Sequence, residues 1–289
     1  MVVIDSPAKL NLALRVLGKR RDGYHELVTL FHRISLKDTL RLQKESDGIR
    51  LICSHPQVPD KKNLIVQAFR LLKKKHPFSG GVTVHLTKRI PVGGGLGGGS
   101  SNAAHFLIAM NRLFELGLSQ RELMNLGGKL GSDVPFFISG ARHAMGRGRG
   151  ERIEPIPFRR RLWFLLLPSL RGLSTQKVYQ ALEPRKPLGS LTGVSRDVRI
   201  ASAFLEKGDL RQAVQFLQND LTKSAEQIRP SLKKTRESLS DLHLGTCQMS
   251  GSGPTLFFIF LSRREALQAF RKLPSRRSFF KSGILCHSL

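Results

Sequence analysis

The chain has 289 residues, of which 40% are hydrophobic, so it is long enough to bury one large core or two ordinary ones. Its 48 lysines and arginines outnumber its 21 aspartates and glutamates, and the net charge of +27 predicts attraction to phosphorylated metabolites or polyanions. No apolar run approaches the ~20 residues of a membrane-spanning helix, and three widely separated cysteines indicate neither a disulfide framework nor a paired-cysteine zinc site.

The N-terminal half is predicted to mix strands and helices. Residues 2–16 alternate in polarity as a strand does. Its apolar positions share one face: Ala8, Leu10, Leu12 and Leu14. Lys9 and Asn11 lie on the other face and are therefore expected to point together. Downstream, strands are predicted at 38–43, 49–53 and 82–88, and helices at 64–75, at 103–116 and after the capping-box pattern of residues 119–122.

The segment 146–150 alternates glycine with arginine, which predicts a flexible stretch and a lobe boundary near it. We expect an N-terminal domain of residues 1–155 and a C-terminal domain of residues 156–289. The following elements are predicted around and after the boundary: strands at 151–156 and 162–167, helices at 175–183, 197–207, 209–219 and 230–242, a strand at 255–261, a helix at 263–272 and a last strand at 279–285.

A glycine-rich loop between a strand and a helix is the densest signal. Its residues are Pro91, Val92, Gly93, Gly94, Gly95, Leu96, Gly97, Gly98, Gly99, Ser100 and Ser101. Glycines let backbone N–H groups approach an anion, and the following helix turns its free N–H groups toward it, so the loop predicts a phosphate site. Ser100 or Ser101 is expected either to cap the helix or to contact phosphate. The Walker pattern fails because Ser, not Lys, follows the last glycine.

Two other motifs accompany the loop, at 6–11 (Ser-Pro-Ala-Lys-Leu-Asn) and 249–255 (Met-Ser-Gly-Ser-Gly-Pro-Thr). Together the three resemble the superfamily named after galactokinase, homoserine kinase, mevalonate kinase and phosphomevalonate kinase (GHMP). Within it, residues 9–12, 21–27, 63–66 and 131–136 are similar to the 4-diphosphocytidyl-2-C-methylerythritol kinase family of the non-mevalonate isoprenoid pathway. The glycines at 251 and 253 suit either a close approach to the acceptor or a tight turn before a strand.

The resemblance implies an α+β fold of two lobes, the first with a left-handed βαβ crossover and the second ferredoxin-like, with ATP and substrate between them. It implies that Lys9 and Asp133 form the catalytic pair and that the loop from Pro91 to Ser101 binds the ATP phosphates. It also implies that Asn63, Leu64 and Lys88 lie near the nucleoside. Without the motif, a helix cap or turn residue is the better interpretation of Asp133, and the alternative for Lys9 is a strand residue that reaches solvent.

The implied substrate is a cytidine diphosphate linked to methylerythritol. Its recognition is assigned to five residues: Asn11, Tyr24, His25, Thr175 and Tyr179. The two tyrosines are suited to stacking on cytosine, and His25 to reading the hydrogen-bonding edge of the base. Asn11 and Thr175 are expected to orient hydroxyls and the catalytic pair. Mg²⁺ is expected with ATP, although no protein ligand for it is indicated.

Two alternatives of function are left open by the residues. One is another kinase of the superfamily, acting on homoserine or a mevalonate-type acceptor without a cytosine pocket. The other is an RNA- or DNA-binding protein that keeps a kinase fold without turnover. We expect the basic side chains to be solvated surface and predict neither a nucleic-acid nor a membrane partner. The first residues lack an export-signal pattern, so a cytoplasmic location is expected. The oligomeric state is not indicated.

Overall fold

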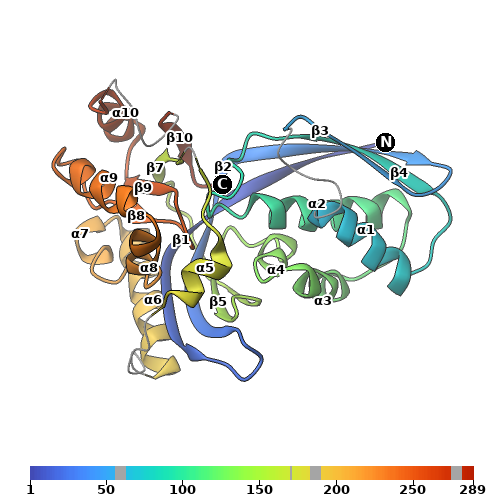
Figure 1. Cartoon of the computed structure of the whole chain (residues 1–289), viewed down its shortest axis with the longest axis horizontal. Coiled ribbons are helices and arrows are strands. Elements are labelled where there is room, and N and C mark those ends of the chain that lie inside the picture. Colours follow the sequence, from blue (N-terminus) through green and yellow to red (C-terminus); the bar gives the residue numbers. More distant parts are fainter. Residues whose placement is uncertain (56–62, 170, 183–189, 275–281) are drawn as a thin grey trace.

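Two β-sheets organise the chain into two lobes that lie side by side (Figure 1). The computed structural model describes residues 1–55, 63–169, 171–182, 190–274 and 282–289. The first sheet has six strands and the second has four. The predicted mixture of helices and strands and the two-lobed arrangement are both confirmed. No helix in these described ranges is long and apolar enough to cross a membrane.

The six-stranded sheet has the order β3-β4-β2-β5-β6, with β1 paired to β2. Its strands are β1 (Val2–Lys19), β2 (His25–Glu45), β3 (Ile49–Cys53), β4 (Gly81–Thr87), β5 (His143–Gly148) and β6 (Arg152–Pro155). Strands β3 and β4 are parallel, and the helix α1 (Leu64–Lys75) connects them as a βαβ unit. The remaining pairs are antiparallel. The last strand of this sheet ends at Pro155, where the predicted first domain ends.

Four helices cover one face of this sheet (Figure 1). They are α1, α2 (Gly98–Leu113), α3 (Gln120–Leu130) and α4 (Val134–Ile138). The predicted capping box is present at α3, where Ser119 and Glu122 bond each other's backbone N–H groups. The buried side of each long helix joins β2 and β4 in one hydrophobic core, which includes Phe69, Phe106 and Val84. This core packs α4 against α2 and α3, and packs α2 against β1, the strand that carries Lys9.

The four-stranded sheet is antiparallel throughout, in the order β10-β7-β9-β8. Its strands are β7 (Trp163–Leu167), β8 (Gln248–Met249), β9 (Leu256–Phe260) and β10 (Ile284–His287). The helices of this lobe are α5 (Thr175–Gln180), α6 (Leu191–Lys207), α7 (Leu210–Ala213), α8 (Thr222–Ile228), α9 (Pro230–Ser240) and α10 (Arg263–Arg271). The predicted domain boundary at 155/156 falls between the two sheets and remains a prediction.

The long β1–β2 ribbon serves both lobes because its side chains alternate between two faces. Leu10 and Leu30 enter a core shared with Phe164 of β7, whereas Phe31 belongs to the core of the first lobe. The prediction that Leu14 shares a face with Leu10 is wrong, since Leu14 joins a third core cluster and lines the same cavity as Lys9. The β1–β2 register shifts between Asn11 and Ala13, and such a shift changes the face of the residues after it.

Several boundaries differ from the prediction. Strand β2 starts at His25, well before the predicted strand at 38–43. The segment predicted to be flexible contributes the end of β5, because hydrogen bonds to β2 stabilise an extended backbone that the local sequence does not favour. Helix α2 starts at Gly98, five residues before the predicted start at Ala103. The helix predicted at 209–219 shortens to α7, and α8 was not predicted. The last strand lies at 284–287, and residues 279–281 of the prediction lie outside the described residues.

Two buried histidines join the lobes behind the ribbon. His32 Nδ1 lies 2.8 Å from His143 Nδ1, and His143 Nε2 lies 2.8 Å from Ser202 Oγ on α6. His32 Nε2 has no partner among the described residues. Burying an N–H without a hydrogen-bond partner costs more free energy than burying an unpaired lone pair, so we assign the His32 proton to Nδ1 and leave Nε2 unprotonated. His32 Nδ1–H then donates to His143 Nδ1, and His143 Nε2–H donates to Ser202. Both rings are therefore neutral.

This pair predicts loss of stability in acid. Burial lowers the pKa of His32 to about 3, and burial with the neighbouring His32 lowers the pKa of His143 well below its ordinary value. The unfolded chain, with pKa values near ~6.5, binds more protons below that pH, so stability falls as pH drops from ~6.5 toward ~3. We expect a loss of about 2 kcal/mol from His32 at pH 5 in urea unfolding, with a further loss from His143. His32→Gln should flatten this slope, and an unchanged slope would contradict the assignment.

Candidate active site

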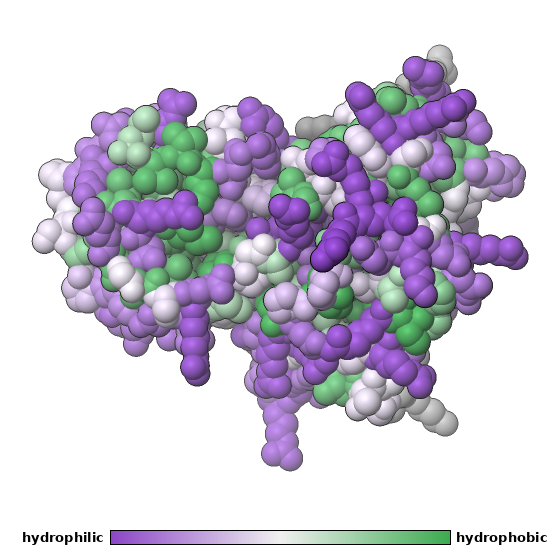
Figure 2. All heavy atoms as spheres, turned by 180° about the vertical axis from the view of Figure 1, so that it is seen from behind, coloured by the Kyte–Doolittle hydropathy of each residue, from purple (hydrophilic) through white to green (hydrophobic). Residues whose placement is uncertain are grey.

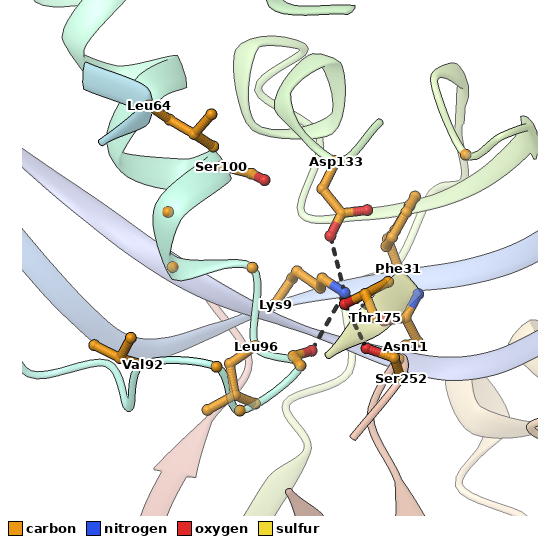
Figure 3. A pocket seen from close by; sticks show the side chains of 18 of the residues that line it. Lys9, Asn11, Phe31, Leu64, Val92, Leu96, Ser100, Asp133, Thr175 and Ser252 are labelled. Atoms are coloured by element: carbon orange, nitrogen blue, oxygen red, sulfur yellow. Dashed lines mark hydrogen bonds and ion pairs between the residues drawn. The ribbon is translucent and has the colours of Figure 1, made fainter. Parts of the chain in front are cut away.

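Lys9 and Asp133 meet although they lie far apart in the chain (Figure 3). Lys9 Nζ lies 3.1 Å from Asp133 Oδ2, and the two side chains are 4% and 29% exposed. Asp133 precedes α4 at the N-cap position, but its side chain makes no capping hydrogen bond. This geometry disagrees with a solvent-facing lysine and with a capping aspartate. The carboxylate is instead held by an ammonium group and remains open on one side.

Asn11 lies beside Lys9 on the same face of β1, as the alternation predicts. Lys9 Nζ donates to Asn11 Oδ1 and, at 3.4 Å, to the Gly95 carbonyl. Asn11 Nδ2 in turn donates to Thr29 Oγ1 at 2.7 Å, and Thr29 donates to the Ala13 carbonyl. These bonds orient the ammonium group toward Asp133.

The glycine loop runs past Lys9 and opens helix α2. Lys9 N donates to the Leu96 carbonyl at 3.0 Å, which ties the loop to β1. Gly93, Gly95 and Gly97 have φ values of 69°, 76° and 70°, the left-handed region that favours glycine. A Cβ on Gly95 would lie 2.3 Å from the Ser250 carbonyl. The loop therefore needs glycine both for its turns and for its close contact with the C-terminal lobe.

The prediction that Ser100 or Ser101 caps α2 is wrong. Gly97 is the N-cap residue, and no side chain caps the helix, so both serines lie within its first turn. Ser101 is fully buried, donates to the Pro7 carbonyl at 2.6 Å and is absent from the lining of both cavities described below. Its side chain thus tethers the helix to β1. Ser100 lines a cavity next to Lys9, and so do the loop residues from Pro91 to Gly99.

Two of the residues predicted near the nucleoside lie beside the start of α2, since a Cβ on Gly98 would lie 3.3 Å from Lys88 Nζ and one on Gly99 would lie 3.8 Å from Leu64 Cδ1. Asn63 caps α1 by accepting from Ile65 N at 2.9 Å, and Leu64 follows it. Lys88 forms an ion pair with the fully buried Asp38. Asn63, Leu64 and Lys88 all line the cavity together with the loop.

The motif at 249–255 completes the wall next to Lys9. Ser250 Oγ accepts from Asn11 N at 3.2 Å and donates to the Gly95 carbonyl at 3.0 Å. A Cβ on Gly251 would lie 3.0 Å from Asn11 Oδ1, whereas one on Gly253 would lie 2.6 Å from Met249 Sδ. The two glycines therefore suit a tight turn before β9, and Gly251 also permits a close approach to Asn11. An approach to the acceptor remains a prediction.

Two cavities meet at the Lys9–Asp133 pair. The first, of about 410 Å³, is lined by Lys9 and the glycine loop. The second, of about 1130 Å³, is lined by the β1–β2 turn and α5. Six residues line both: Leu27, Ser100, Asp133, Arg149, Thr175 and Tyr179. Asp133 therefore has access to ligands in either cavity.

The predicted substrate residues gather in the second cavity, except Asn11, which lies in the first. The ring of Tyr179 stacks on His25, with centroids 5.2 Å apart and an interplanar angle of 29°. Tyr24 is 52% exposed. Thr175 Oγ1 lies 2.8 Å from Ser252 Oγ, which links α5 to the third motif. Burial and the nearby Lys19 charge lower the pKa of His25, so its ring is neutral at neutral pH.

Comparison with known proteins agrees with this geometry. The family model for the GHMP kinases N terminal domain matches residues 63–141, and that for GHMP kinases C terminal matches residues 200–277. A 4-diphosphocytidyl-2-C-methyl-D-erythritol kinase of Syntrophus aciditrophicus is 40% identical over 274 residues, which cover 93% of each chain. One of Acaryochloris marina is 38% identical over 282 residues, covering 91% of this chain and 88% of the relative.

The chain belongs to the 4-diphosphocytidyl-2-C-methyl-D-erythritol kinase family. A crystal structure of a 4-(cytidine 5'-diphospho)-2C-methyl-D-erythritol kinase superposes with a TM-score of 0.80 at 33% identity, over 99% of this chain and 98% of the other. The mevalonate kinase of L. major, at 17% identity and a TM-score of 0.73, shares the fold, over 100% of this chain and 96% of the other. The predicted two-lobed GHMP kinase fold and kinase family are thus confirmed.

Two residues of this kinase site were missed in the sequence. Arg149 lines both cavities, and its guanidinium carbon lies 4.4 Å from the centre of the Tyr24 ring. It belongs to the segment predicted to be flexible, where only the pairing of β5 reveals its position. Asp38 accepts from Arg89 N and Ile90 N at 2.7 and 2.9 Å, so it holds the start of the glycine loop. An isolated aspartate within a strand gives no local signal of this role.

Proposed function

We propose that this chain transfers the γ-phosphoryl group of ATP to the 2-hydroxyl of 4-diphosphocytidyl-2-C-methyl-D-erythritol, giving the 2-phosphate and ADP in the non-mevalonate isoprenoid pathway. The observation that carries the proposal is the Lys9–Asp133 pair. It lies where the cavity lined by the glycine loop meets the larger cavity lined by the β1–β2 turn and α5. The names of the relatives supply the identity of the acceptor.

In this reaction Asp133 accepts the proton of the attacking hydroxyl, while Lys9 stabilises the negative charge that develops on the oxygen. The oxygen forms a bond to the γ-phosphorus as the bond from that phosphorus to the bridging oxygen of ADP breaks. Backbone N–H groups of the glycine loop and of the first turn of α2 bind the phosphates. The protein's main contribution is alignment, because phosphoryl transfer requires little covalent chemistry from side chains.

Magnesium is part of the proposal. Mg²⁺ in such sites usually binds the nucleotide phosphates, water and one or two protein oxygens. The Ser100 hydroxyl lines both cavities and fits a metal that arrives with ATP. Within the described ranges, no group of three or more histidine, cysteine or acidic side chains forms a separate metal site. The bound ion would neutralise charge on the phosphates.

Recognition of the cytidine half is assigned to Tyr24, His25 and Tyr179. His25 is neutral, so one ring nitrogen donates and the other accepts, which suits the mixed edge of cytosine. Tyr179 already stacks on His25, and Tyr24 presents a half-exposed ring. Asn11 and Thr175 orient hydroxyls, and Arg149 brings positive charge to the place where the diphosphate would pass.

A cytoplasmic location and the absence of a nucleic-acid partner remain predictions. The basic residues divide evenly, with 25 in residues 1–155 and 23 in residues 156–289. Figure 2 shows hydrophilic side chains spread over both lobes of one face. A protein that follows a nucleic-acid backbone concentrates its charge in one groove or stripe. This spread therefore favours the metabolic kinase over the nucleic-acid binder.

A substrate panel tests the proposal. The purified chain, given Mg-ATP and 4-diphosphocytidyl-2-C-methyl-D-erythritol, should release one ADP per product phosphate. Homoserine and mevalonate should give no release above background. Turnover of either of them, with none of the cytidine compound, would assign the chain to the alternative kinase.

The variant Tyr24→Ala tests the cytidine pocket separately. One stacked base contributes ~1 to 3 kcal/mol, so we expect KM for the cytidine substrate to rise by about 5-fold to 150-fold, with KM for ATP unchanged. The matched control Tyr24→Phe keeps the ring and should keep most of the affinity. An equal rise in both KM values would argue against stacking at this residue.

A further inference from the structure

Arg33 is a buried cation without an acidic partner. The residue is 9% exposed, and no carboxylate pairs with it in the part of the chain that the structure describes. Its Nη2 atom donates to the Phe136 and Phe137 carbonyls at 3.0 and 2.6 Å. Burial and the nearby Arg142 lower the pKa of Arg33 to about 10, so it keeps its charge at neutral pH. A buried unpaired cation is costly, which calls for a reason to keep it.

The strand register relates this cation to the catalytic lysine. Arg33 on β2 lies directly opposite Lys9 on β1, and directly opposed residues of an antiparallel pair point to the same face. Both side chains reach α4, but at different ends. Lys9 pairs with Asp133 just before the helix, whereas Arg33 binds carbonyls near its C-terminal end. Cations at that end also interact favourably with the helix dipole.

Helix α4 needs such support because it has only five residues. A single isolated turn is not stable by itself in water, so external contacts must set its position. The Arg33 guanidinium carbon lies 5.3 Å from the centre of the Phe136 ring and 5.8 Å from that of Phe137. The Phe136 ring stacks on Phe31 at 4.7 Å, and Phe31 is the ring beneath Lys9 Nζ. These contacts limit rotation of α4 about its axis.

We infer that Arg33 is a positioning residue for phosphoryl transfer, which fixes α4 so that the Asp133 carboxylate stays opposite Lys9. The inference rests on the proposed function for its kinetic consequences. Arg33 lines neither cavity and acts through α4 alone. Lys9 and Arg33 thus have different roles on the same face of the sheet. Lys9 contacts Asp133, and Arg33 binds the opposite end of α4.

Kinetics of Arg33→Met provide the first test. Methionine keeps much of the apolar stem and removes the two donated bonds. We expect kcat to fall by about 10-fold to 100-fold, because a displacement of ~1 Å at a catalytic group has effects of this size, with KM for ATP within about threefold. Arg33→Lys, whose ammonium group can donate to both carbonyls, should recover much of the lost kcat.

The matched control is Arg142→Met, which removes an exposed neighbouring cation and leaves the backbone bond from Arg33 N to the Arg142 carbonyl in place. It should leave kcat within about twofold. Wild-type kcat in Arg33→Met would overturn the inference, as would a loss of kcat that Arg33→Lys does not recover. A crystal structure of Arg33→Met or Arg33→Lys supplies a readout that does not depend on the acceptor. In Arg33→Met the Lys9–Asp133 separation should exceed ~4 Å, and an unchanged ion pair would refute the role. Absence of turnover in the wild type would refute the proposed function instead.

Discussion

Asp133→Asn is expected to lower kcat by about 10²-fold to 10⁴-fold with little change in KM for either substrate. The amide keeps the shape of the carboxylate but cannot accept the proton of the hydroxyl. It also removes the negative charge that holds Lys9 Nζ at 3.1 Å. Initial rates of ADP release, with circular dichroism to verify folding, measure the effect. Undiminished turnover in a folded variant would exclude Asp133 as the base.

A double-mutant cycle sharpens this prediction. Lys9→Met removes the ammonium group and should by itself cause a loss of similar size, since the two groups act on the same proton and the same developing charge. The double variant should lose little more than either single variant, because residues that act as a unit are strongly non-additive. Losses that multiply in full would show that the two side chains work independently, against the arrangement proposed here.

Gly95→Ala is the second change with a large expected effect. Gly95 has a φ of 76°, and an added Cβ would lie 2.3 Å from the Ser250 carbonyl and 3.0 Å from the Gly253 carbonyl. These are backbone atoms, so the loop and the third motif must move apart. The Gly95 carbonyl accepts from both Lys9 and Ser250, and the displacement therefore reaches the reaction centre. We expect kcat/KM for ATP to fall at least 100-fold, consistent with misplacement of the phosphate site.

The matched comparison is Gly99→Ala in the same loop. There the nearest atom to an added Cβ is Leu64 Cδ1 at 3.8 Å, and the residue lies in the first turn of α2. The loss of kcat/KM should be at least tenfold smaller than for Gly95→Ala. Equal losses would mean that any methyl group in the loop blocks ATP, and that the contact with Ser250 has no special role. Urea unfolding of both variants separates a local shift from general loss of stability.

The amino-acid sequence alone determined the features that depend on local patterns. Alternation along residues 2–16 placed Lys9 and Asn11 on one face, because successive strand side chains point to opposite sides. The glycine loop between a strand and a helix predicted a phosphate site, since the backbone conformation that such a site needs is local. The pairing of Lys9 with Asp133 came from a resemblance to known kinases, and no local pattern contains it.

Only the tertiary structure decided the positions that depend on distant partners. The segment 146–150 looked flexible by composition, yet pairing with β2 makes part of it a strand and brings Arg149 to both cavities. Ser101 resembled a helix cap, but the packing of α2 on β1 buries it. The opposed pair of Lys9 and Arg33 appears only once the register of β1 and β2 is set. Local preference selects helix or strand, whereas register, burial and the meeting of remote side chains follow from how whole elements pack.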